Sequence, residues 1–202
     1  MDARAEILSR ISGAAVAPSA YFEEPVVDST RPHDEVVEQF ADYAADYKAN
    51  VIRATFEGLP DTLANLLPLE GTVIPKDLPT SWLTDNIGTL RDENLSIAEL
   101  DRVNAVLTGC AIAIAETGTI VLDSGFAQGR RAITLVPDHH VCVVFENQIV
   151  DSIPEAFREL RGAAEAGRPQ TWISGPSATS DIELSRVEGV HGPRRLDIVI
   201  VR

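Results

Sequence analysis

The feature that most restricts the fold of this chain is a series of short apolar runs in its C-terminal half. Several of them are continuously apolar rather than alternating between apolar and polar residues. Such a strand is typical of a sheet covered on both faces, because each side of it must meet packed side chains. The runs cover Ala111–Ala115, Thr119–Leu122, Ala132–Val136, Val141–Phe145, Thr171–Ser174 and Leu196–Val201. The sequence therefore predicts an α/β domain with a three-layer α/β/α arrangement.

Helical patterns precede and interrupt these strands. Helices are predicted at Ala3–Ile11, Asp34–Glu57, Asp61–Leu67, Leu95–Leu107 and Pro154–Ala166, an extended loop through Pro18, Ser19 and Pro25, and a short strand at Gly71–Pro75. Ser96 precedes Glu99 by three residues, the spacing of a capping box. No linker rich in Pro, Gly or Ser divides the chain. We expect one domain over residues 1–202, mainly helical at 1–67 and α/β at 68–202.

Charge and hydropathy exclude several classes of protein. The net charge is −14, with 31 acidic against 17 basic residues and no run of Lys or Arg. Such a surface repels phosphodiester backbones, so nucleic-acid binding is not expected. No apolar run approaches 18 residues, and charged side chains occupy the start of the chain. These features predict no membrane span and a cytoplasmic location.

Two cysteines and four histidines limit the metal chemistry open to this chain. Cys110 and Cys142 lie in strand-like runs without a C-x-x-C pair, so we expect them to be buried and reduced. An iron–sulfur cluster would need more thiolates, and no cofactor is expected in this chain. His139, His140 and His191 form no short metal-binding spacing, which leaves only a site assembled across the fold.

The first candidate site is the turn Glu116-Thr117-Gly118-Thr119 between two apolar runs. Partial burial there would raise the pKa of Glu116 toward a value useful for acid–base chemistry, so Glu116 is a candidate nucleophile or base. The alternative is structural: its carboxylate accepts N–H hydrogen bonds across its own turn.

The second candidate site is the turn from Ser174 to Asp181, which contains Gly175, Ser177 and Thr179. Glycines and hydroxyls after a strand expose N–H and O–H groups that suit an anion. Ser177 is predicted to cap a helix whose N-terminus faces the carboxyl ends of the strands. The negative charge of Asp181 then requires a nearby arginine.

Four arginines and one exposed histidine could supply the positive charge. Arg130 and Arg131 precede one apolar run, and Arg194 and Arg195 precede another. Arginine binds a carboxylate with two parallel hydrogen bonds, although any of these side chains could equally be a solvated charge at a strand edge. His191 lies in a glycine-rich loop and can protonate near neutral pH.

Four sequence blocks, taken in order and spacing, resemble the lactate-utilization protein C family, the LUD-domain proteins. They are Ala113–Leu122, Leu135–His140, Ser174–Glu183 and Gly189–Pro193. The resemblance implies a fold like that of ribose-phosphate isomerases and CoA transferases. It also implies a place in the bacterial conversion of L-lactate to pyruvate, beside iron–sulfur partner subunits. CoA transferases of this fold use a Glu as acyl acceptor near a glycine turn, and Glu116-Thr117-Gly118 resembles that arrangement.

Three hypotheses follow. The first is a non-redox component of an L-lactate utilization system that binds a small carboxylate, a phosphorylated ligand or iron–sulfur subunits. Its predicted ligand-binding residues are Thr117, Gly118, Thr119, Ser174, Gly175, Ser177, Thr179, Asp181, His191 and Arg131. The second is an enzyme like CoA transferases or sugar-phosphate isomerases, with Glu116 as nucleophile or base. The third is a rigid scaffold for an oligomer or complex.

Overall fold

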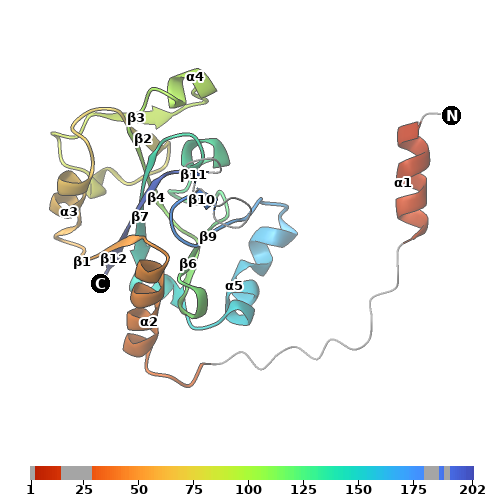
Figure 1. Cartoon of the computed structure of the whole chain (residues 1–202), viewed down its shortest axis with the longest axis horizontal. Helices are drawn as coiled ribbons and strands as arrows, with labels where there is room; N and C mark the ends of the chain where they lie inside the picture. Colours follow the sequence, from red (N-terminus) through yellow and green to blue (C-terminus); the bar gives the residue numbers. More distant parts are fainter. Residues whose placement is uncertain (1–2, 15–28, 180–186, 189–191) are drawn as a thin grey trace.

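Six strands form one parallel sheet in the order β1-β12-β7-β4-β2-β3 (Figure 1). They are β1 (Asn50–Ala54), β2 (Thr72–Pro75), β3 (Thr89–Asp92), β4 (Ala105–Gly109), β7 (His139–Phe145) and β12 (Arg195–Val201). The computed structural model describes residues 3–14, 29–179, 187–188 and 192–202. The α/β class predicted from the apolar runs is confirmed.

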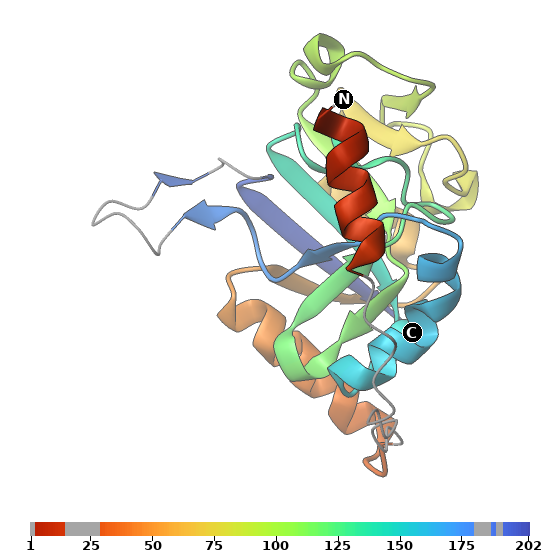
Figure 2. The same cartoon turned by 90° about the vertical axis from the view of Figure 1, so that its right-hand side faces the viewer.

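A second, four-stranded sheet packs against the large one, in the order β8-β5-β6-β9. Its strands are β5 (Ile112–Ile114), β6 (Thr119–Leu122), β8 (Ile149–Val150) and β9 (Thr171–Ile173). The short antiparallel pair β10 (Ala178–Thr179) and β11 (Val187–Glu188) projects from the body of the molecule (Figure 2).

Helices cover both sides of these sheets. They are α1 (Ala3–Gly13), α2 (His33–Asp46), α3 (Leu59–Leu66), α4 (Ile97–Leu100) and α5 (Ile153–Glu165), with 3-10 turns η1 (Thr80–Trp82), η2 (Ala115–Thr117), η3 (Arg131–Thr134) and η4 (Glu146–Gln148). Helix α3 packs on one face of the large sheet, while α2 and the small sheet pack on the other. Helix α5 covers the outer face of the small sheet, on the opposite side of the molecule from α3 (Figure 1). Helix α1 has no buried residue and lies apart from this body (Figure 1).

The central strands are apolar on both sides because both sides are covered. On β7, Cys142 and Val144 contribute to the core shared with α2, while Val141 and Val143 contribute to the core shared with α3. Helix α2 places Phe40, which is fully buried, into the first of these cores. Burial of such a large apolar side chain contributes roughly 1.5–3 kcal/mol.

Two predicted helices are wrong in length, because pairing in the sheet overrode helical periodicity. The predicted helix Asp34–Glu57 ends at Asp46, Lys48 takes a left-handed conformation with φ 74°, and strand β1 follows. The predicted helix Leu95–Leu107 is reduced to the single turn α4. Its capping box between Ser96 and Glu99 is confirmed, but Ala105–Gly109 enters the large sheet as β4.

Two further predictions about local structure are also wrong. The run Ala132–Val136 is no strand: η3 crosses the sheet face there, and its Ile133 is buried with Val73 and Val106. No helix begins after Ser177, because the next two residues form β10. The predicted loop through Pro18, Ser19 and Pro25 lies outside the described residues.

Candidate functional site

The two glycine turns predicted from the sequence do meet in space. The hydroxyl oxygens of Thr119 and Ser174 lie 2.7 Å apart, and Thr119 also lies 2.7 Å from the hydroxyl of Thr117. This contact joins the start of β6 to the end of β9, which pair as antiparallel neighbours. The hydroxyls of the first turn are therefore engaged with the protein itself.

Close approach to helix α2 explains both glycines. Gly118 has φ 58°, and a Cβ atom there would lie 2.5 Å from the backbone nitrogen of Ala44. Gly175 has φ 81°, and a Cβ atom there would lie 2.1 Å from the carbonyl oxygen of Tyr47. Both turns thus press against the C-terminal end of α2, and only glycine fits such positions.

Glu116 lies on the outside of this junction. Its side chain is exposed, and its carboxylate accepts a hydrogen bond from the N–H of Ile153 at 3.1 Å. Ile153 is the first residue of α5, where a carboxylate interacts favourably with the helix dipole. The backbone N–H of Glu116 also donates to the carbonyl oxygen of Asp151 at 3.0 Å. Glu116 therefore caps a helix, and its catalytic role remains a prediction.

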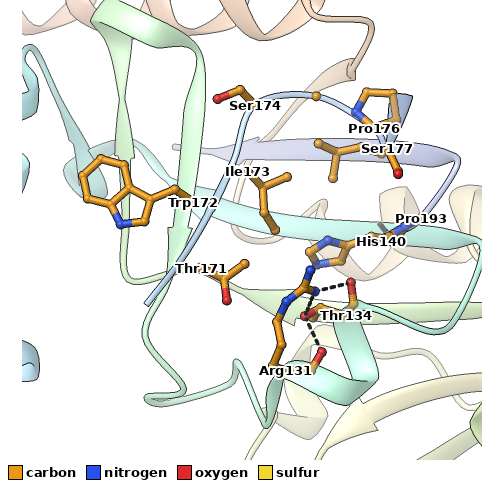
Figure 3. A pocket seen from close by; sticks show the side chains of 13 residues that line it. Arg131, Thr134, His140, Thr171, Trp172, Ile173, Ser174, Pro176, Ser177 and Pro193 are labelled. Carbon is orange, nitrogen blue, oxygen red and sulfur yellow. Dashed lines mark hydrogen bonds between the residues drawn. The ribbon is translucent and has the colours of Figure 1, made fainter. Parts of the chain in front are cut away.

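The Ser174 turn lines a cavity of about 240 Å³ (Figure 3). Its walls also include His140 and Leu196, the second residues of β7 and β12, so it lies at the amino ends of these strands. The expectation that this turn faces the carboxyl ends is therefore wrong. The full lining is Arg131, Thr134, His140, Thr171, Trp172, Ile173, Ser174, Gly175, Pro176, Ser177, Gly192, Pro193 and Leu196.

Arg131 supplies the positive charge of this cavity. One terminal nitrogen of its guanidinium donates to the carbonyl oxygen of Thr134 at 2.9 Å and to its hydroxyl at 3.1 Å. Within the described residues it has no carboxylate partner, and the lining contains no Asp or Glu. Burial lowers the pKa of Arg131, because part of the cation is removed from water with no compensating anion among the described residues. Such a cavity favours an anionic ligand.

His140 is buried beside Arg131, with 1% of its surface exposed. Its Nε2 atom lies 2.8 Å from the hydroxyl of Thr108 on β4. Burial, together with the nearby charges of His139 and Arg131, lowers the pKa of His140 to about 3. The imidazole is therefore neutral at physiological pH and acts through its hydrogen bonds.

His139 faces the other side of the sheet, because consecutive residues of a strand point in opposite directions. Its Nε2 lies 2.8 Å from the fully buried carboxylate of Asp197, which also accepts hydrogen bonds from Arg195 and Asn50. Burial alone would raise the pKa of Asp197, but the hydrogen bonds from these groups outweigh it and lower the pKa. His139 and Arg195 thus stabilise a buried charge, and they are separate from the cavity.

The remaining arginines of interest are paired with carboxylates. Arg130 binds Asp92 through two hydrogen bonds of 2.6 and 2.8 Å, and Arg194 lies 3.7 Å from Asp138. Arg130 and Asp92 line a second cavity of about 590 Å³ at the carboxyl ends of β2 and β3, whose lining also includes Arg131 and mixes both signs of charge through Lys76, Asp77 and Glu93.

The cavity unites only part of the predicted ligand-binding set. Arg131, Ser174, Gly175 and Ser177 line it, and Thr119 reaches it through Ser174. Thr117 and Gly118 pack toward α2 instead, and Thr179 contributes backbone to β10. Asp181 and His191 lie outside the described residues.

Sequence reasoning missed His140 as a lining residue and missed Thr134, Thr171 and Thr108 altogether. Thr108 and His140 become neighbours only through the pairing of β4 with β7. A polar residue interrupting an apolar strand was the available signal for both.

The described residues contain no group of three or more His, Cys, Asp or Glu side chains that could hold a metal ion. Among them, no helix is both long and apolar enough to cross a membrane. Both cysteines are buried and free, as predicted, and a hydrogen bond with Cys142 together with burial raises the pKa of the Cys110 thiol.

The chain is similar to one known protein family and to several known proteins. A family model described as LUD domain matches residues 80–201. A protein of Deinococcus radiodurans named Lactate utilization protein C is 47% identical over 204 residues, which cover 99% of this chain and 96% of that protein. A Bacillus subtilis protein of the same name is 31% identical over 180 residues, 86% of this chain and 70% of that protein. The crystal structure of a DUF162 family protein from Deinococcus radiodurans has a TM-score of 0.76 and 43% identity, and it covers 85% of this chain and 99% of that one.

Proposed function

Because the chain belongs to the LUD-domain family, as its resemblance to that family predicted, we propose that it takes part in lactate utilization. Its part is that of a non-redox component, which binds a small anionic metabolite in the cavity beside Arg131. The names of its relatives support the pathway, and the chemistry of the cavity supports the ligand class.

The observation that carries the ligand class is a guanidinium that, within the described part of the chain, has no carboxylate partner and lies in a cavity whose described lining contains no acidic residue. The protein as a whole is strongly acidic, with a net charge of −14. An anion would be repelled from most of its surface, so a pocket whose described polar lining comprises Arg131, a neutral imidazole and hydroxyl groups is a favourable place to bind one. A carboxylate fits the fork of a guanidinium with two hydrogen bonds.

Titration calorimetry on the full chain tests this proposal with L-lactate and pyruvate. We expect binding to the wild type and a loss of at least about tenfold in affinity in Arg131→Gln, because one charge-assisted hydrogen-bonding group is removed. Arg194→Gln is the matched control, since it removes the same charge from an exposed side chain outside the cavity lining. The proposal would be contradicted if neither acid bound the wild type. It would also be contradicted if both variants lost affinity equally.

Iron–sulfur subunits remain the proposed partners for the electron transfer that lactate oxidation requires. The chain has only two cysteines, too few to ligate a four-cysteine cluster by itself. Co-purification of the tagged chain from lactate-grown cells, followed by absorbance spectroscopy and metal analysis, tests the partnership. Recovery of the chain without iron would contradict it.

A further inference from the structure

Within the described part of the chain, one of the two ring nitrogens of His140 has a hydrogen-bond partner. Nε2 lies 2.8 Å from the Thr108 hydroxyl, and among the described residues Nδ1 has no hydrogen-bond partner. The ring is almost fully buried, yet it lines the cavity that contains Arg131. A polar atom that has no partner among the described residues and belongs to a side chain lining a cavity is expected to bind what enters there, because leaving it unsatisfied is destabilising.

The Thr108 hydroxyl decides which nitrogen carries the proton. Thr108 is fully buried, and its only hydrogen-bond partner among the described residues is Nε2 of His140. A buried hydroxyl has one hydrogen to donate, and here the sole acceptor for it is the ring nitrogen. Nε2 therefore accepts, and the single proton of the neutral imidazole resides on Nδ1.

The cavity thus combines a guanidinium with a neutral N–H donor. Figure 3 shows the guanidinium of Arg131 beside the imidazole of His140, with Thr171 to their left and Ser177 above them. A simple carboxylate that binds the guanidinium through both of its oxygens leaves no further oxygen for the imidazole. A carboxylic acid that carries an oxygen on C2 offers acceptors to both groups.

We propose that His140 is a specificity-determining residue, whose Nδ1–H donates a hydrogen bond to the C2 oxygen of a 2-oxo- or 2-hydroxycarboxylate held by Arg131. This inference rests on the proposed function and adds to it the chemical group of the ligand, the C2 oxygen, that the cavity recognises. An analogue without the C2 oxygen leaves the buried N–H unpaired, and sites of this kind reject such analogues.

Three-carbon acids isolate this feature. Calorimetry on the full chain compares pyruvate, L-lactate and propionate, which differ only at C2. We expect both oxygenated acids to bind the wild type about tenfold or more tightly than propionate. Equal affinities for all three would overturn the inference and leave the proposed function intact, whereas binding of none would overturn both.

Two substitutions separate a hydrogen-bonding role from a packing role. His140→Phe keeps an aromatic ring without a donor. Its affinity for each of the three acids should therefore equal the affinity of the wild type for propionate. His140→Asn places an amide N–H close to the position of Nδ1, so it should restore the preference at least in part. A wild-type preference retained in His140→Phe would overturn the inference.

The tautomer gives a measurement that does not depend on any variant. Long-range ¹H–¹⁵N spectra of the wild-type chain should show His140 protonated at Nδ1, and this signal should shift when pyruvate is added but not when propionate is added. Protonation at Nε2, or equal shifts with both acids, would overturn the inference.

Discussion

Arg130 and Arg131 are adjacent in sequence and both line the cavity at the carboxyl ends of β2 and β3, but of the two only Arg131 also lines the cavity at the amino ends of β7 and β12. Arg130 holds Asp92 at the carboxyl end of β3 through two hydrogen bonds, and this arrangement lowers the pKa of the carboxyl. Arg131 points into the cavity at the amino ends of β7 and β12, where it bonds only to Thr134 among the described residues. The first cation therefore stabilises the fold, and the second is available to a ligand.

The proposed ligand cavity lies at the opposite edge of the sheet from the one that the topology of α/β sheets leads one to expect. Ligands of open sheets commonly bind beyond the carboxyl ends of the strands. Here the cavity at that edge contains charges of both signs, of which Arg130 and Asp92 neutralise each other. Among the residues that the structure describes, the lining of the cavity at the amino edge has a cation and no anion. Charge pairing, rather than the direction of the strands, distinguishes the two.

The largest loss of stability is expected at Gly175, where the turn that lines the cavity at the amino edge packs against the end of α2. In Gly175→Ala the new methyl group would lie 2.1 Å from the carbonyl oxygen of Tyr47, at a φ of 81°. We expect a loss of about 3 kcal/mol or more in the free energy of unfolding, measured in urea. Gly167→Ala is the matched control, because it has a φ of 69° and open space around the Cβ position. It should lose only about 1 kcal/mol, and equal losses would contradict the close packing.

The next effect separates the two arginines directly. Asp92→Ala leaves Arg130 without its carboxylate, and we expect a loss of about 2 kcal/mol in unfolding free energy because the carboxyl is buried. Arg131→Gln should change stability by less than about 1 kcal/mol, since no ion pair is broken. Urea unfolding of both variants measures these two changes in the free energy of unfolding. A larger destabilisation by Arg131→Gln would remove the distinction between a structural and a ligand-binding arginine.

Stability should depend on pH differently at the two edges of the sheet, because His140 titrates at the amino edge and Asp92 at the carboxyl edge. The pKa of His140 is lowered from 6.5 to about 3 on folding, so the unfolded chain binds a proton that the folded chain does not. Stability is therefore complete above pH 6.5 and should fall by about 1 kcal/mol by about pH 5.5. Asp92, whose pKa is lowered by its hydrogen bond with Arg130, contributes stability that is lost only below 3.8.

Thermal unfolding at a series of pH values can measure this difference. His140→Gln retains a hydrogen-bonding group for Thr108 but does not titrate, so its stability should vary less between pH 6.5 and about pH 5.5 than that of the wild type. Identical profiles would contradict the assignment of this window to His140.

The smallest effect is expected at the turn that does not line the cavity. Glu116→Gln keeps an oxygen that can accept from the N–H of Ile153, so unfolding free energy should fall by less than about 1 kcal/mol. Binding of pyruvate should be unchanged. A loss of ligand binding or of turnover in this variant, with the fold intact, would instead support the alternative of an enzyme that uses Glu116 as nucleophile or base.

Local sequence determined the elements whose pattern and packing agree. The apolar runs that became β5, β6, β7, β9 and β12 were predicted to within about two residues, because continuous apolar character is what a covered strand needs. Helix α5 and the capping box of α4 were predicted for a similar reason. The glycine turns at Gly118 and Gly175 were also found, since their positive φ angles require glycine.

Only the tertiary structure decided what those turns do and where the charges lie. Val51 and Ile52 continue the helical period of α2, yet pairing with β12 makes them a strand. Nothing near Arg130 and Arg131 in sequence separates their roles, because Asp92 lies 38 residues from one and His140 reaches the other only through the folded sheet. A chain encodes the conformational preferences of its own segments, but the neutralisation of a charge depends on which distant side chain the fold brings beside it.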